Sequence, residues 1–200
     1  YDHFPYDNLM FESGQMCKTR NIPRLARSKF DRILYHENVP RFDHFCGWVH
    51  NTIGEENYRF FLLFLAVHVA MCMYGTYAVS VLSHGYIIDE NLLNVTFFDR
   101  VSGAEIPSSY WIVFQYLFRR YMLEMGTLAM TSVMSIALGL FLSYHAWLTS
   151  RGLTTNEAFK WDQVKRWYSR ELARYKDAVR KGKVVVDAPN VTKEQIDDIN

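Results

Sequence analysis

Three residues close together in the chain, Asp43, His44 and Cys46, carry the side chains that nucleophilic thiol chemistry requires. A histidine can take the proton of a cysteine thiol, and a carboxylate can orient and stabilise the resulting imidazolium. The three lie in the stretch FDHFCGWVHNTIGEENYRFF, residues 42–61, just before a hydrophobic segment. The pattern indicates either a reactive thiol at a membrane surface or a turn in which Cys46 packs as a small hydrophobic residue.

The composition of the 200-residue chain argues against several other classes of protein. The formal net charge is only +1, so the total charge gives no case for binding nucleic acid. The 3 cysteines, at positions 17, 46 and 72, are odd in number and have no paired spacing. This argues against a disulfide framework and against a cysteine-rich zinc module. The opening residues do not have the pattern of a signal peptide, and we expect further chain upstream of Tyr1.

Two segments are long and apolar enough to cross a membrane. Residues 60–82 contain no formally charged side chain and can span a hydrocarbon layer of roughly 30 Å. Residues 121–148 form the second span, whose small residues allow helices to approach closely. We therefore expect an α-helical integral membrane protein with two transmembrane helices, joined by a loop over residues 83–120.

Polar side chains within and beside these spans admit functional and structural interpretations. His68 and Cys72 lie four residues apart on one helical face, but two ligands do not make a metal site, and contacts between helices can satisfy both. Arg120 and Glu124 have the spacing of an ion pair at the entrance to the second span, with a proton relay as the alternative.

The distribution of basic residues predicts the topology. The segment before the first span carries 8 Lys or Arg, the tail after the second carries 11, and the segment between them only 3. Because positive charge is retained on the cytosolic or matrix side, we expect both ends of the chain there and residues 83–120 opposite.

The tail, residues 149–200, is predicted to be largely helical. Thr154 and Glu157 have the spacing of a capping box, so a helix should begin there. Apolar residues then recur every three or four positions with Lys and Arg between them until Gly182, at Trp161, Val164, Tyr168, Leu172, Tyr175 and Val179. This amphipathic helix can lie on a membrane surface, on a partner helix or against the N-terminal module. The last residues resemble a polar extension.

The N-terminal module, residues 1–59, is expected to be loop-rich because Pro and Gly interrupt any long periodicity. Its motifs PYDNLMFESGQMC, PRLARSK and RFDHFCGW, then Asn51, Gly54 and NYRFFLLFL, follow one another in an order that resembles the DHHC protein S-acyltransferases, or palmitoyltransferases. TTNE, residues 154–157, resembles the TTxE motif that follows the last span in that family.

The resemblance implies a function for the three residues named first. In the family, the cysteine of the DHHC motif accepts a fatty acyl group from acyl-CoA and passes it to a cysteine of a substrate protein. By position, Cys46 would be the nucleophile, His44 the base and Asp43 its orienting partner. The second histidine of the family's motif, a zinc ligand, is Phe45 here.

The chain departs from the family at the positions that hold two structural zinc ions. Only Cys17 is kept outside the motif, and the remaining ligand positions are Arg20, Phe30, Asp31, Leu34, Glu37 and Thr52. Because zinc requires four nitrogen or sulfur ligands in a closed tetrahedron, we do not expect zinc here. We expect Phe30, Leu34 and Phe45 to form a small apolar core in its place, and Asp31 and Glu37 to pair with neighbouring arginines.

Two hypotheses remain open from the sequence. In the first, Cys46 is the acyl carrier of a DHHC-type acyltransferase that uses acyl-CoA and acts on a membrane protein substrate. In the second, the chain is a catalytically silent relative that serves as a structural subunit of a larger membrane protein assembly. The intact Asp43, His44 and Cys46 favour the enzyme, whereas the missing zinc ligands favour the silent subunit.

Overall fold

The chain divides into two compact units, and its two long apolar helices lie almost entirely in one of them. The computed structural model describes residues 4–6, 10–11, 13–17, 19, 21–34, 36–99 and 101–182, so Arg20 and the polar extension beyond residue 182 lie outside the described residues. One unit comprises Tyr1–Tyr58 and Leu148–Asn200, and the other comprises Arg59–Trp147. Each unit is described by itself below.

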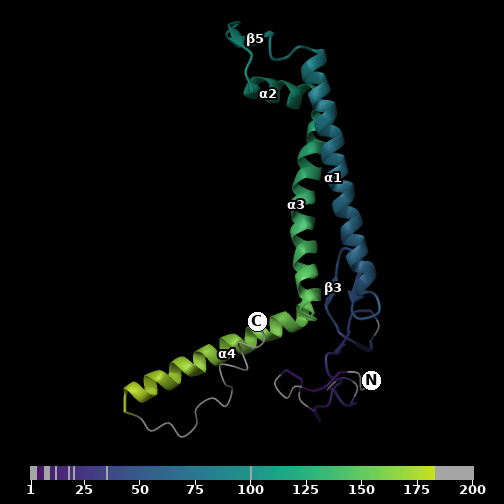
Figure 1. Cartoon of the computed structure of the whole chain (residues 1–200), viewed down its shortest axis with the longest axis vertical. Helices are drawn as coiled ribbons and strands as arrows, with labels where there is room; N and C mark the ends of the chain where they lie inside the picture. The colour runs from purple at the N-terminus through teal and green to yellow at the C-terminus, as the bar shows by residue number, and fades with distance from the viewer. Residues whose placement is uncertain are drawn as a thin grey trace. The chain divides into compact units, whose positions relative to one another are not determined.

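The helices α1 (Tyr58–Asp89) and α3 (Met122–Ser150) run side by side (Figure 1). Both are long and apolar enough to cross a membrane, and few of their side chains are buried within the protein. A helix with an outward-facing apolar surface of this length is suited to a bilayer rather than to water. The predicted α-helical fold with two membrane-spanning helices is therefore confirmed, and residues 60–82 lie within α1.

The two spanning helices approach closely where their side chains are small. A Cβ atom added at Gly75 of α1 would lie 3.2 Å from the Thr131 methyl group of α3. The hydroxyl groups of Thr76 and Thr131 are 3.2 Å apart and form a hydrogen bond between the helices. Within α1, His68 Nδ1–H donates to the Phe64 carbonyl oxygen at 2.7 Å, so this hydrogen bond is made within its own helix and not between helices.

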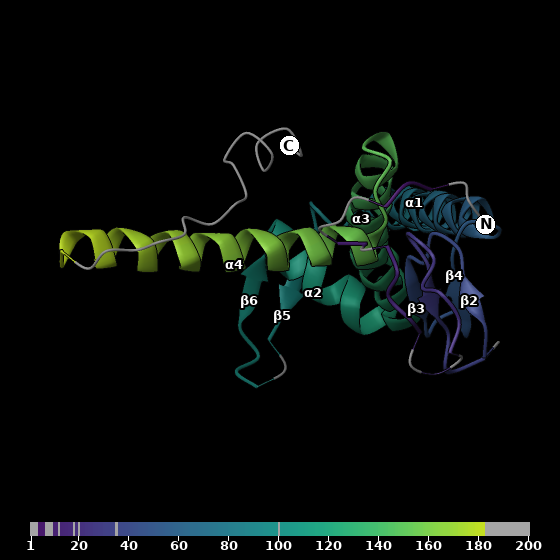
Figure 2. The same ribbon diagram turned by 90° about the horizontal axis from the view of Figure 1, so that it is seen from below.

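A small folded region joins these helices at one end. The chain leaves α1, forms the hairpin of β5 (Thr96–Phe98) and β6 (Glu105–Pro107), and enters α2 (Tyr110–Arg120) (Figure 2). Its core contains Leu92, Val113, Leu117 and Met125.

The break between α2 and α3 explains why one expected ion pair does not form. Tyr121, with φ −121° and ψ 54°, is not helical, so Arg120 and Glu124 are not one turn apart on a continuous helix. The Arg120 guanidinium lies over the Tyr121 ring instead, 5.5 Å from its centroid. The Tyr121 hydroxyl donates to Glu90 at 2.5 Å.

The other unit begins with short antiparallel hairpins rather than continuous loops. In the first, β1 (Lys29–Phe30) pairs with β2 (Asn38–Val39). In the second, β3 (His44–Cys46) pairs with β4 (Asn51–Ile53), with His44 opposite Ile53 and Cys46 opposite Asn51 (Figure 2).

The same unit contains α4 (Thr155–Arg180), whose start the sequence predicts. The Thr154 hydroxyl accepts a hydrogen bond from Glu157 N–H at 3.2 Å, and the Glu157 carboxylate accepts one from Thr154 N–H at 3.0 Å. These reciprocal bonds satisfy two amides that a helix start leaves free. The expected capping box is therefore confirmed. The helix ends before Gly182, whose φ of +67° lies in the left-handed region that glycine tolerates.

Candidate active site

The β3–β4 hairpin brings His44 and Cys46 onto one face. Successive side chains of a strand alternate between faces, so residues two apart point the same way. Asp43 directly precedes β3, and its N–H donates to the Ile53 carbonyl oxygen at 2.9 Å, which ties the residue to the hairpin. The three residues singled out by the sequence are thus brought together by short-range pairing.

The Asp43 carboxylate is at the centre of a hydrogen-bond network. It is 2 % exposed, and His44 Nδ1–H donates to its Oδ2 at 2.6 Å. Thr155, the first residue of α4, donates twice: its N–H to Oδ1 at 2.6 Å and its hydroxyl to Oδ2 at 3.0 Å. Burial alone would raise the pKa of Asp43, but the hydrogen bonds from His44 and Thr155 outweigh it and lower that pKa.

The same network favours a thiolate at Cys46. Burial disfavours the charged forms of both residues, which alone would lower the pKa of His44 and raise the pKa of Cys46. Hydrogen bonds and charge interactions outweigh burial at both residues. Hydrogen bonds that His44 donates to Asp43 and Cys46 raise the pKa of His44. The Val49 and Trp48 amides and the His44 side chain lower the pKa of Cys46. The arrangement therefore stabilises a thiolate and imidazolium pair, the reactive form of a cysteine nucleophile.

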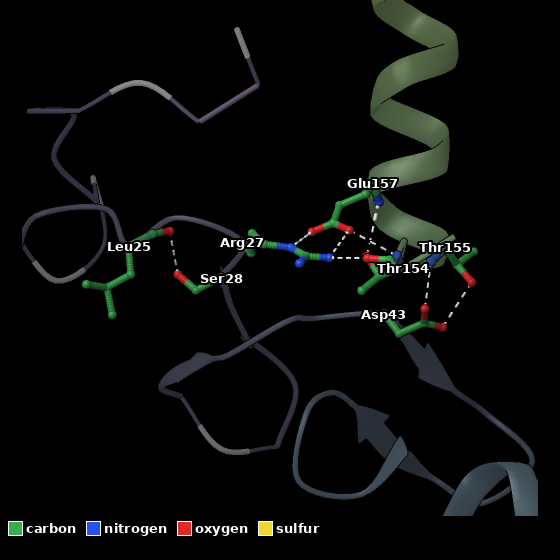
Figure 3. A network of polar contacts seen from close by, with 8 residues as sticks. Leu25, Arg27, Ser28, Asp43, Thr154, Thr155 and Glu157 are labelled. Atoms are coloured by element: carbon green, nitrogen blue, oxygen red, sulfur yellow. Dashed lines mark hydrogen bonds and ion pairs between the residues drawn. The ribbon is translucent and has the colours of Figure 1, made fainter. Parts of the chain in front are cut away.

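A second set of contacts fixes the start of α4, as Figure 3 shows. The Arg27 guanidinium donates to both carboxylate oxygens of Glu157, at 2.5 and 2.6 Å, and to the Gly152 carbonyl oxygen at 2.7 Å. Glu157 is 2 % exposed and also closes the capping box with Thr154. The next residue, Thr155, donates to Asp43, so the two sets of contacts meet in the first turn of the helix (Figure 3).

An open pocket of about 800 Å³ lies beside this network within the same unit. Asp43, His44 and Thr155 contribute to its wall. The pocket is also lined by the basic side chains of Arg24, Lys29 and Arg32. The wall of this pocket therefore combines polar, apolar and positively charged side chains. It lies next to His44, the residue that contacts the candidate nucleophile Cys46.

Sequence reasoning missed two participants in the site. Arg27 is one of several scattered basic residues in the N-terminal module and nothing in the sequence distinguishes it from them, yet it forms a part-buried ion pair with a residue 130 positions away. Thr155 was identified within a motif, but nothing in the sequence showed that it contacts Asp43, 112 positions away. Only the resemblance of TTNE to a family motif gave a signal for this region.

At most of the positions where the resemblance implies zinc, the chain has residues that zinc does not use as ligands, among them Phe30, Leu34 and Phe45. Among the residues that the structure describes, no three of His, Cys, Asp or Glu lie close enough to hold a metal. Asp31 and Thr52, both at ligand positions, form a buried hydrogen bond with each other, from the Thr52 hydroxyl to Asp31 Oδ2 at 2.8 Å. Phe45 lies edge-on to His50, with 5.8 Å between ring centroids.

Comparison with known proteins places the chain in a family. The family model described as DHHC palmitoyltransferase matches residues 10–162. The chain is 30% identical over 164 residues to palmitoyltransferase SWF1 of Yarrowia lipolytica, covering 82% of this chain and 41% of that protein. It is 30% identical over 166 residues to palmitoyltransferase ZDHHC4 of Mus musculus, covering 82% and 48% respectively. With human palmitoyltransferase ZDHHC15 it shares 36% identity over 121 residues, 60% of this chain and 29% of the relative.

The two long apolar helices and the family match show that the protein is an integral membrane protein. It belongs to the DHHC palmitoyltransferase family. The chain spans less than half the length of each of these relatives.

Proposed function

We propose that this chain carries the reaction site of a protein S-acyltransferase, with Cys46 as nucleophile, His44 as its base and Asp43 as the orienting partner. The observation that supports this most directly is the set of contacts that runs from Cys46 through His44 to a buried Asp43. In a chain of this family, such a network favours the transferase over a silent structural subunit, which would need neither a lowered thiol pKa nor an oriented histidine.

The proposed reaction has two balanced halves. In the first, His44 takes the Cys46 proton, and the sulfur attacks the carbonyl carbon of the acyl-CoA thioester. A new carbon–sulfur bond forms as the bond to CoA breaks, and the departing CoA thiolate takes the proton from His44. In the second, His44 takes the proton of a cysteine in the substrate protein. That sulfur bonds to the acyl carbon, and Cys46 departs and regains its proton.

The pocket beside His44 is the proposed site for the polar part of acyl-CoA, the co-substrate implied by the family. Arg24, Lys29 and Arg32 supply positive charge for its phosphate groups. Lys29 is held in place by the Phe42 ring, whose centroid lies 4.5 Å from Nζ. The acyl chain would then extend toward the bilayer, and the substrate would be a membrane protein.

We propose further that both ends of the chain lie on the cytosolic or matrix side, where the basic residues gather. This orientation would give the site at Cys46 access to CoA dissolved in the aqueous compartment. The segment of residues 83–120 would lie on the opposite side. Epitope insertion in that segment and protease protection of sealed vesicles tests the orientation. Cleavage of the inserted epitope from the cytosolic side would contradict it.

The N-terminal module is proposed to fold without zinc. The buried hydrogen bond between Asp31 and Thr52 links two positions at which the family has metal ligands. Asp31 also accepts from the Ile33 N–H at 2.8 Å, and its own N–H donates to the Glu37 carbonyl oxygen at 2.8 Å. Metal analysis of the purified protein tests this proposal, and two zinc ions per chain would overturn it.

Transfer of a labelled acyl group tests the proposed function. Purified protein in detergent is incubated with radiolabelled palmitoyl-CoA, and hydroxylamine-sensitive label on the protein is measured. We expect label on the unmodified protein and on Cys72→Ser, and none on Cys46→Ser. Absence of label on the unmodified protein, under conditions that label an active palmitoyltransferase, would contradict the proposal.

A further inference from the structure

The ion pair between Arg27 and Glu157 joins two distant parts of the chain at the site. The guanidinium meets the carboxylate through two hydrogen bonds, the planar geometry that makes arginine–carboxylate pairs strong. Arg27 adopts a φ of +56°, a left-handed conformation that is uncommon for residues other than glycine. The loop therefore takes a strained backbone conformation at the residue whose side chain reaches α4.

The buried carboxylate of Glu157 takes part both in the ion pair and in the helix cap. Its Oε2 accepts both from Arg27 and from the N–H of Thr154, which is the residue that caps α4. Arg27 also donates to the Gly152 carbonyl oxygen, just before the cap. The position of the first turn of α4 thus depends on the Arg27 side chain from both sides of the cap.

That first turn contains the donors that hold Asp43. Thr155 follows the cap directly, and its N–H and hydroxyl both reach the Asp43 carboxylate. A carboxylate that accepts two donors from one residue has little rotational freedom, and neither has the imidazole that donates to it. A shift of the helix start would therefore be passed to His44 through Asp43.

We propose that Arg27 and Glu157 are positioning residues of the site: their ion pair fixes the start of α4, so that Thr155 holds Asp43 and the His44 side chain in line with Cys46. The proposal rests on the proposed acyl transfer for its effect on rate. Its effect on the Cys46 thiol is independent of that reaction.

Three variants separate the ion pair from the helix cap. Glu157→Gln keeps an acceptor for the Thr154 N–H, because glutamine also completes a capping box, but removes the charge that pairs with Arg27. Arg27→Lys keeps the charge but loses the two-pronged contact. The double variant Arg27→Gln/Glu157→Gln tests whether the two effects are coupled. Arg166→Ala, which breaks the exposed ion pair of α4 with Asp162, is the matched control.

Two readouts are compared in purified full-length protein. The first is the rate of Cys46 alkylation by iodoacetamide as a function of pH, followed for the Cys46 peptide by mass spectrometry. The second is the rate of Cys46 acylation by labelled palmitoyl-CoA at several concentrations. Circular dichroism and the melting temperature establish that each variant is folded.

We expect Glu157→Gln to move the alkylation midpoint to higher pH and to lower kcat for acylation about tenfold or more, with KM for palmitoyl-CoA unchanged. Arg27→Lys should have a smaller effect in the same direction, the double variant less than the sum of the single changes, and Arg166→Ala no effect. A folded Glu157→Gln or Arg27→Lys protein with an unchanged midpoint and rate would overturn the inference. If the unmodified protein is not acylated but the midpoint still shifts, the proposed function fails and the positioning role stands.

Discussion

Thr155 holds the Asp43 carboxylate with two hydrogen bonds, one from its main-chain N–H at 2.6 Å and one from its hydroxyl at 3.0 Å. The main-chain donor belongs to the first residue of α4, where N–H groups have no partner within the helix. The positive end of the helix dipole points the same way and favours the ionised carboxylate. The helix terminus thereby acts together with His44 to stabilise the ionised carboxylate of Asp43.

This geometry predicts that the two donors of Thr155 can be removed one at a time. Thr155→Val removes the hydroxyl only, and we expect a loss of a few-fold in Cys46 acylation. Thr155→Pro also removes the N–H, and a proline is tolerated in the first turn of a helix. A proline also requires an extended backbone at the residue before it, and Thr154 already has one, with φ −98° and ψ 161°. We expect the proline variant to keep its helix content and to lose about a hundredfold in acylation rate.

Circular dichroism and the acylation assay together test these two variants. Ser169→Pro lies within α4, away from the site, and serves as the contrast, because a proline in the helix interior should reduce helix content. If Thr155→Pro were as active as Thr155→Val, the main-chain donor would have no part in holding Asp43.

The shifted pKa values predict how Cys46 reactivity depends on pH. The lowered pKa of Cys46 means that its alkylation rate should reach half its maximum at a lower pH than that of an ordinary exposed cysteine. Because Asp43 contributes to the raised pKa of His44, Asp43→Asn should weaken the imidazolium and move the Cys46 midpoint upward. The measurement is the pH profile of iodoacetamide modification at Cys46, with Cys17 read in the same digest as an internal reference.

The same shifts determine the pH dependence of stability, with opposite signs for the two residues. The pKa of Asp43 is lowered by folding, so its contribution is present above the unfolded value of about 3.9 and is lost as the pH falls through the folded value. The pKa of His44 is raised, so its contribution is present below about 6.5 and is lost as the pH rises through the folded value. Urea unfolding of wild-type and His44→Gln protein should therefore differ most at mildly acidic pH and converge at alkaline pH. A difference that instead grew toward alkaline pH would contradict the assigned shift.

The buried pair of Asp31 and Thr52 predicts a stability cost that is independent of metal. Thr52→Val keeps the side-chain shape but removes a donor from a carboxylate that is 3 % exposed. We expect a loss of about 1.5–3 kcal/mol in the free energy of unfolding, the range for a hydrogen bond to a charged group. A metal chelator should not change the free energy of unfolding of either protein.

An exposed pair of the same chemistry provides the control for Thr52→Val. The Ser102 hydroxyl donates to Asp99 at 2.8 Å on the surface, so Ser102→Ala should cost much less. Equal costs at the two sites, or destabilisation of the wild-type protein by the chelator, would show that the Asp31–Thr52 contact does not hold the module together.

Features that depend on residues close together in the sequence were easier to predict than contacts between distant residues. The capping box requires only Thr154 and Glu157, three residues apart, and the sequence predicts it. The strand that places His44 and Cys46 on one face was not predicted, because residues 1–59 were expected to be loop-rich. The partner of Glu157, by contrast, is 130 residues away, and a run of scattered arginines does not indicate which one will be buried. The expected ion pair between Arg120 and Glu124 does not form. The expectation assumed one continuous helix, and Tyr121 interrupts it.

The contact between the two spanning helices gives the last prediction. A side chain at Gly75 would begin with its Cβ 3.2 Å from the Thr131 methyl group, tighter than ordinary van der Waals contact. Gly75→Leu should therefore separate α1 from α3 and break the hydrogen bond between Thr76 and Thr131, with a loss of about 1–3 kcal/mol. Gly85→Leu, in the same helix but with open space around its Cβ, should be close to neutral. Thermal unfolding in one detergent compares the two. Equal melting temperatures would mean that α1 and α3 do not meet at Gly75.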